Sequence, residues 1–305
     1  MKVKFLPYLL LIIAPLLWGG NFLTGRLMHG EIPPFTFSFY RWILVTLFLL
    51  PFVWKEFIAK WPSIRSHLGL YAVLAFTGVS CYTSFVYWSL NYTSVVNASL
   101  INAMVPAMIL LISWGCFGNR ISWKQIIGIT ISLIGVLFIV LQGQFRKVLT
   151  LGLDRGEIIM MVAVVAWAFY SILLKRLAKE KTPFLTLFIN SLIGVIFLIV
   201  PFLYEFFSNE YMHVTLQSTA GLLYTALFAS IVSYSCWNTG IRELGAEHGG
   251  HFYNLLPVFG AILGVLFLGE SFRWFHWVGI LLVFFGIFFA TGLGKRRIHQ
   301  NKPQR

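Results

Sequence analysis

One apolar stretch occurs twice in the chain, and this repeat decides the fold. Residues 254–272 read NLLPVFGAILGVLFLGESF, and residues 102–120 read NAMVPAMILLISWGCFGNR. With an offset of 151 residues and no gap, Pro106 falls on Pro257. The match extends to both sides of these stretches, so the chain has two related halves.

Further equivalent positions define the extent of the repeat. At the offset of 151 they are Trp123 with Trp274, Gly128 with Gly279, Gly135 with Gly286 and Ser84 with Ser235. Nearer the start of each half the offset becomes 149, and the pairs are Trp18 with Trp167 and Pro34 with Pro183.

The composition excludes a soluble globular protein. Of the 305 residues, 58% are hydrophobic and only 11% are charged, whereas a soluble domain carries about 25% charged residues. The net charge of +13 does not indicate nucleic-acid binding, because the Lys and Arg residues lie in short segments between apolar runs. Cys81, Cys116 and Cys236 lie inside apolar runs, so we expect them to be small buried side chains.

Ten apolar runs are long enough to span a bilayer, which requires about 20 residues. They are continuous rather than alternating, so they predict helices and not a barrel. We expect an all-α integral membrane protein with spans at 8–28, 35–54, 69–90, 94–117, 122–141, 157–175, 184–206, 217–240, 246–268 and 274–293.

The basic residues predict the orientation of these spans. With the N-terminus inside, 17 Lys and Arg residues lie on the inner side and 5 on the outer side. This bias predicts that both termini are cytoplasmic. The expected organisation is a first five-helix repeat at 8–141, a second at 157–293 and a basic cytoplasmic tail at 294–305. The apolar N-terminus is interpreted as an uncleaved first helix.

A repeat of five helices has a mechanical consequence. Because five is odd, the second copy enters the membrane from the opposite side, so the two halves are inverted. Inverted repeats are a known basis of alternating access, in which one repeat moves against the other around a central site. The alternative is a duplication that only enlarges a membrane scaffold.

At this point the chain resembles a known family. The resemblance rests on three motifs: WGGNF in the first span, PPFTFSFYR leading into the second, and a proline followed thirteen residues later by Glu270. Together with the inverted ten-span repeat, they resemble the EamA branch of the drug/metabolite transporter superfamily over nearly the whole chain. Asn119 is a departure, since the family commonly carries an acid at this position in each half.

The resemblance implies a secondary transporter of small metabolites in the cytoplasmic (inner) membrane. Amino acids or related small organic solutes are the expected substrates, and export is the expected direction on family grounds. No GxxxxGK[ST] loop is present, which disfavours ATP drive by this chain.

The expected partners are a small-molecule substrate and the lipid bilayer, with the chain a monomer or a homodimer. We expect no enzymatic activity, cofactor, metal or nucleic acid. The alternatives are a membrane receptor or scaffold and an intramembrane lipid-modifying enzyme.

Polar and aromatic side chains inside the spans are the candidates for a central cavity. An unsatisfied polar group in hydrocarbon costs several kcal/mol, so such groups are expected to face partners or water. Aromatic rings with a few amides suit small zwitterions or flat solutes. The candidates for substrate binding are Trp18, Asn21, Arg41, Tyr82, Tyr87, Asn97, Asn102, Trp167, Tyr170, Tyr234, Trp237, Asn238, His251 and Asn254.

Each group also has a structural interpretation. Arg41, the one basic residue well inside a span, is either an interhelical tie or the binder of an anionic substrate group. His251 and Glu270 are candidates for proton coupling, although His251 could simply hydrogen-bond in the cavity wall and Glu270 could cap a helix end. Pro106 and Pro257 are candidate hinges that could equally serve static packing.

Overall fold

The computed structural model describes residues 5–27, 31–93, 95–144, 154–177, 182–208, 211–268 and 273–291, and within them every regular element is helical. The helices of the first half are α1 (Leu6–Leu27), α2 (Pro34–Ala59), α3 (Trp61–Arg65), α4 (Leu68–Leu74), η1 (Ala75–Cys81), α5 (Tyr82–Ser89), α6 (Val95–Asn102), α7 (Val105–Phe117) and α8 (Trp123–Val140). Those of the second half are α9 (Arg155–Leu174), α10 (Pro183–Phe207), α11 (Leu216–Tyr224), η3 (Thr225–Val232), α12 (Ser233–Leu244), α13 (Ala246–Gly249), η4 (Gly250–Asn254), α14 (Leu255–Leu268) and α15 (Trp274–Thr291).

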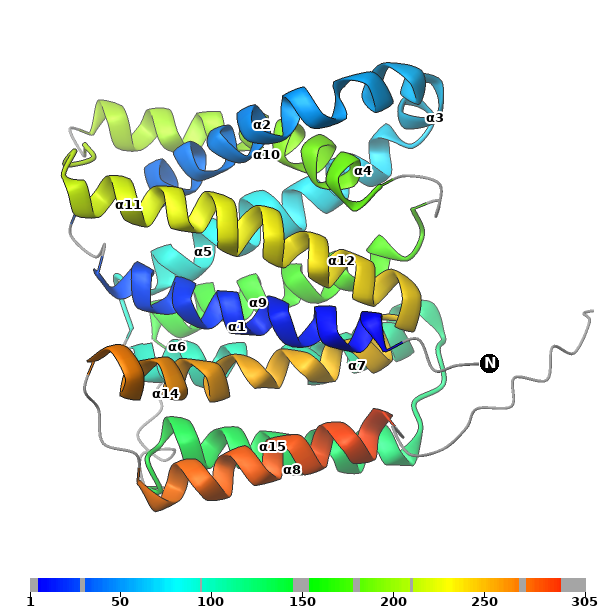
Figure 1. The fold of residues 1–305 in the computed structure, drawn as a ribbon, viewed down its shortest axis with the longest axis vertical. Helices are drawn as coiled ribbons and strands as arrows, with labels where there is room; N and C mark the ends of the chain where they lie inside the picture. Colours follow the sequence, from blue (N-terminus) through cyan, green and yellow to red (C-terminus); the bar gives the residue numbers. More distant parts are fainter. Residues whose placement is uncertain are drawn as a thin grey trace, which may run out of the picture.

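The helices form a bundle of aligned spans (Figure 1). Eight helical segments of the described ranges are long and apolar enough to cross a membrane, and a shorter apolar helix covers Leu6–Asn21. The predicted ninth span is present as the interrupted run α13–η4–α14. Helix α1 begins on the right of Figure 1, beside the marked N-terminus. We call this side of the bundle the α1-start face, and the other side the opposite face.

Four spans contain irregular helix, at equivalent places in the two halves. The third and eighth spans pass through π-helical segments, η1 and η3, which in α-helices are frequent at functional sites. The fourth and ninth spans break before a proline. Pro106 lies in the first turn of α7 and Pro257 near the start of α14. A proline removes one helical hydrogen bond and its ring collides with the carbonyl four residues earlier, so each span breaks just before its proline.

Helices α8 and α15 show the two-fold relation of the halves directly. Each helix carries two glycines, and each glycine faces the one that is not its equivalent. A methyl carbon on Gly128 would lie 2.6 Å from the carbonyl oxygen of Gly286, and one on Gly135 would lie 2.7 Å from that of Gly279. This exchange of partners is the signature of a two-fold axis between antiparallel helices.

Helices α2 and α10 show the same two-fold relation, because a carboxylate near the end of each helix binds the start of the other. Glu205, near the end of α10, accepts hydrogen bonds from the backbone N–H groups of Phe35 (3.0 Å) and Thr36 (2.6 Å) at the start of α2. Glu56, near the end of α2, accepts from the hydroxyl of Thr182 (2.7 Å), the residue that caps α10. Glu56 and Glu205 differ by the repeat offset of 149. Each carboxylate therefore caps the positive end of the equivalent helix in the other half.

The glycine contact predicts a stability effect. Gly135→Ala should lower the thermal unfolding temperature in detergent, because the added methyl forces α8 away from α15 at a cost of about 1–3 kcal/mol. Gly115→Ala is the matched control, since a methyl there would meet nothing within 4 Å. Equal unfolding temperatures for the two variants would contradict the close packing.

The capping carboxylates predict how much unfolding free energy each of three variants loses. Glu205 is buried, so Glu205→Ala leaves the backbone donors of α2 unpaired and should cost about 2–3 kcal/mol. Glu205→Gln keeps an acceptor and should cost about half as much. Glu56→Ala, at the more exposed equivalent position, should cost about 1 kcal/mol or less. Thermal unfolding of the three variants checks this order, and an equal loss from both alanine variants would contradict it.

Candidate functional site

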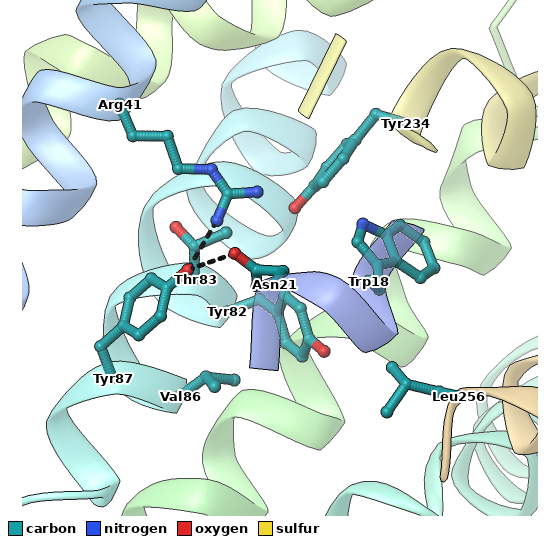
Figure 2. Close-up of a pocket in the computed structure, with 9 residues that line it drawn as sticks. All are labelled: Trp18, Asn21, Arg41, Tyr82, Thr83, Val86, Tyr87, Tyr234 and Leu256. Carbon is teal, nitrogen blue, oxygen red and sulfur yellow. Dashed lines mark hydrogen bonds between the residues drawn. The ribbon is translucent and has the colours of Figure 1, made fainter. Parts of the chain in front are cut away.

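A cavity lies at the centre of the bundle, where spans of both halves meet. It has a volume of about 340 Å³ including its open mouth. Helices α1, α2 and α5 of the first half and α12 and α14 of the second contribute its walls (Figure 2). The lining residues are Trp18, Asn21, Arg41, Tyr82, Thr83, Val86, Tyr87, Tyr234 and Leu256.

Arg41 carries the positive charge of this cavity. It comes from the second turn of α2, and its side chain points between Tyr87 and Tyr234 (Figure 2). The guanidinium donates to the hydroxyl of Ser230 (2.6 Å), to that of Tyr87 (2.9 Å) and to the carbonyl of Ala229 (3.3 Å). These acceptors are all neutral. Among the described residues no carboxylate lies within ion-pair distance of Arg41, although the residue is only 2% exposed.

Tyr87 and Asn21 continue the hydrogen bonds of Arg41 along the cavity wall. The Tyr87 hydroxyl accepts from Arg41 and donates to the Asn21 side-chain oxygen at 2.9 Å (dashed lines in Figure 2). This leaves the Asn21 amide group as a donor at the rim. The N–H groups of Arg41 and Asn21 that these bonds do not use are the donors that the wall can offer to an anionic or carbonyl group.

The π-helical segments supply backbone acceptors at the same centre. A π turn shifts the helical register by one residue and so frees carbonyls from the regular pattern. The carbonyl of Gly78 in η1 accepts from Tyr234 at 2.8 Å, and that of Ala229 in η3 accepts from the indole of Trp18 at 2.9 Å. Gly78 and Ala229 are equivalent positions at the offset of 151. Both halves thus fix an aromatic wall residue in the same way.

An aromatic cluster packs behind the wall residue Trp18. Trp18 packs edge-on against Trp167, with ring centroids 5.3 Å apart, and contacts Trp237 at 5.5 Å and Tyr253 at 5.8 Å. Trp167 also stacks on Tyr170 at 5.1 Å. Such edge-on and offset arrangements are the favourable ones for aromatic rings.

Six of the fourteen predicted binding residues line the cavity. They are Trp18, Asn21, Arg41, Tyr82, Tyr87 and Tyr234. Thr83, Val86 and Leu256 line it as well and were not predicted, because a threonine, a valine and a leucine inside apolar runs carry no distinguishing signal. Whether the wall residues bind a substrate remains a prediction.

The remaining candidates lie outside the cavity wall. Asn97 donates to Glu157 at 2.9 Å, at the opposite face, and Asn102 accepts from Tyr253 at 3.2 Å and from Tyr82 at 3.4 Å. Tyr82 and Tyr253 also share a short hydrogen bond. These residues tie helices together around the cavity. The other six are buried and do not line the cavity: Trp167, Tyr170, Trp237, Asn238, His251 and Asn254.

Asn119 has a cross-half partner that the repeat did not reveal. Its amide donates to the side chains of Glu247 (2.7 Å) and Ser113 (2.9 Å), and Ser113 donates to Glu247 at 2.6 Å. An acid at position 119 would therefore place two carboxylates in contact, which explains an amide there. Glu270, the equivalent acid, lies outside the described residues.

Two other predictions concern hinges and metals. The proline positions mark the breaks in the fourth and ninth spans, and their role as hinges stays a prediction. Within the described ranges no group of three His, Cys, Asp or Glu side chains is placed to hold a metal ion.

Comparison with known proteins places this geometry in a family. The chain is 28% identical to the uncharacterized transporter YyaM of Bacillus subtilis, covering 97% of each chain. It is 31% identical to an uncharacterized transporter of Archaeoglobus fulgidus, covering 93% of this chain and 96% of that one. It is 26% identical to a probable amino-acid metabolite efflux pump of Escherichia coli, covering 92% of each.

A solved crystal structure shares the fold. It superposes with a TM-score of 0.74 over 95% of this chain and 99% of its own, at 16% identity. The family model of EamA-like transporters matches residues 5–141 and 154–292, which together are most of the chain. The protein is a multi-pass membrane protein, and it belongs to the EamA-like transporter family.

Proposed function

We propose that this chain is a secondary carrier for a small organic solute with a carboxylate group, such as an amino acid or a related metabolite. The observation that carries the proposal is Arg41, a buried cation in the wall of the central cavity whose described partners are all neutral. Burying a charge is costly unless it is compensated. A bound carboxylate supplies that compensation through two parallel hydrogen bonds.

The surrounding rings fit the rest of such a solute. Trp18, Tyr82 and Tyr234 present aromatic surface beside the guanidinium (Figure 2). Aromatic faces attract an ammonium group and stack on planar side chains. The name of the Escherichia coli relative, a probable amino-acid metabolite efflux pump, points to the same solute class.

The proposed direction of transport and the proposed membrane location rest on other observations. We infer export across the cytoplasmic membrane from the resemblance to the family. The excess of Lys and Arg at the α1-start face supports a cytoplasmic position of that face and of both termini. The repeat of five helices supports alternating access as the mechanism.

Arg41 provides the main test. The purified chain is reconstituted into liposomes preloaded with one unlabelled amino acid, and entry of the same labelled amino acid is measured across the proteinogenic set. We expect accumulation of at least one of them above protein-free liposomes. Arg41→Gln should raise the KM for that amino acid about tenfold or more, which corresponds to the loss of a charge-assisted hydrogen bond.

Two controls separate binding from folding. Ser230→Ala removes one hydrogen bond of the guanidinium and keeps its charge, so it should leave the KM within about threefold of the native value. The amide of the transported amino acid should lose little from Arg41→Gln, because it lacks the carboxylate. A native KM for the carboxylate form in Arg41→Gln, at equal abundance and stability, would contradict the proposed role of Arg41.

His251 is the proposed proton carrier. It is 1% exposed, and its ring nitrogens have no hydrogen-bond partner among the described residues. We expect His251→Gln to abolish transport driven by a pH gradient and to preserve exchange of solute for solute, because glutamine hydrogen-bonds but does not carry a proton. His248→Gln, one helical turn away, should keep both activities. Loss of exchange as well would make His251 a binding or structural residue, and full gradient-driven transport would remove it from coupling.

A further inference from the structure

The hydrogen bond between Tyr87 and Asn21 in the cavity wall occurs a second time, deep in the other half. Tyr170 donates to the side-chain oxygen of Asn238 at 2.8 Å, as Tyr87 donates to that of Asn21 at 2.9 Å. By the repeat offsets, Asn21 corresponds to Tyr170 and Tyr87 corresponds to Asn238. The two halves therefore make the same bond with tyrosine and asparagine exchanged.

Other cavity residues also have equivalents beside this second bond. Trp18 corresponds to Trp167 and Val86 to Trp237. The seven first-half wall residues all have equivalents in the second half, and those of Tyr82 and Thr83 are Ser233 and Tyr234, of which Tyr234 itself lines the cavity. We call the other five equivalents the mirror set. It consists of Trp167, Tyr170, Asn190, Trp237 and Asn238, all 0% exposed. The wall residues and the mirror set thus occupy equivalent positions in the two halves, and the mirror set is fully buried.

Several polar atoms of the mirror set and of the residues near it are buried and unpaired. The indole N–H of Trp167 and the amide nitrogen of Asn238 are buried without a hydrogen-bond partner in the described part of the chain. So are both ring nitrogens of His251 and the side-chain oxygen of Asn254, which follow toward the α1-start face. In a lipid-surrounded interior each such group is costly. A second conformation in which water reaches these atoms would remove that cost.

A polar contact joins the two halves near the α1-start face. Glu247 on α13 belongs to the second half, and its carboxylate is held by Ser113 and Asn119 of the first half. Gln125 at the start of α8 adds a bond to the Glu247 backbone carbonyl at 3.2 Å. Because these bonds join the two halves, they must break if the halves separate at this face. We call this contact the Glu247 latch.

We propose that the mirror set lines a second cavity, which opens to the α1-start face when the Glu247 latch is released and the central cavity closes. This inference rests on the proposed carrier function and names the residues of the other half of its cycle. The two cavities differ in chemistry, since Asn190 stands at the position equivalent to Arg41. The mirror cavity therefore presents amides and aromatic rings to the solute. The positive charge of Arg41 belongs to the central cavity alone.

Cysteine labelling tests the proposal without any transported solute. Single cysteines are placed at Asn238 and at its equivalent Tyr87, in a chain whose Cys81, Cys116 and Cys236 are replaced by alanine. A membrane-impermeant maleimide is applied to vesicles from one side at a time. The exposed positions Ser66 at the α1-start face and Gln144 at the opposite face, each as a cysteine variant, report which side the reagent reaches.

The expected result is reciprocal. Asn238→Cys should be labelled from the α1-start face, and Tyr87→Cys from the opposite face. Val283→Cys is the buried control, because Val283 is 0% exposed in the contact of α15 with α8. With the open state populated at a few per cent, labelling of Asn238→Cys should exceed this control about tenfold.

Release of the latch gives the second readout. Asn119→Asp places a carboxylate against Glu247, so it should speed labelling of Asn238→Cys and slow that of Tyr87→Cys. Labelling of Asn238→Cys as slow as Val283→Cys in both backgrounds would overturn the proposal and show a static polar core. Labelling of Asn238→Cys from the opposite face alone would overturn it too. Reciprocal labelling in a chain that carries no carboxylate solute would keep the mirror cavity and refute the proposed substrate class.

Discussion

Polar groups inside a bilayer must be satisfied by the protein itself, and the arrangement of this chain follows from that constraint. Lipid offers no hydrogen bonds, so the carboxylates at the ends of α2 and α10 find partners at the free N-terminal backbone groups of the neighbouring helix. The same contacts hold the two halves together. The charge of Arg41, by contrast, is left with neutral partners in the wall of the central cavity.

The two halves approach each other most closely at α8 and α15. The glycines of α8 and α15 bring backbone against backbone, so a single methyl would not fit. Between this contact and the α2–α10 pair lie the four interrupted spans, the third, fourth, eighth and ninth. Interrupted helices have fewer regular hydrogen bonds to lose on bending, and discontinuous spans surround the midplane sites of inverted-repeat carriers. The proposed alternating access therefore assigns the scaffold and the moving parts to different helices.

Much of this architecture was predictable from the residues. The apolar runs and the fixed offset between Pro106 and Pro257 identify ten spans and two inverted halves. Arg41 and Trp18 were predictable as wall residues, because charge and indole N–H groups in a span need partners. The offset of 149 between Glu56 and Glu205 was also present in the sequence, and it would have predicted the paired caps.

The rest of the site depends on information that a sequence does not carry. Thr83, Val86 and Leu256 line the cavity only because of the rotation of their helices, which is set by packing between the halves. The partner of Asn119 is Glu247, a contact between the halves that the repeat itself does not reveal. The mirror set carries the same residue types as the cavity wall but is buried, so residue type alone could not separate its members from the residues that line the cavity.

Alternate opening of the two halves at the two faces can be measured as distances between pairs of spin labels. One pair joins Ser66 and Glu243 at the α1-start face, and the other joins Gln144 and Val214 at the opposite face. If the carrier works by alternating access, a transported solute shifts the two distance distributions in opposite directions, so that one pair lengthens as the other shortens. Distributions that stay unchanged with solute, or that lengthen together at both faces, would contradict it.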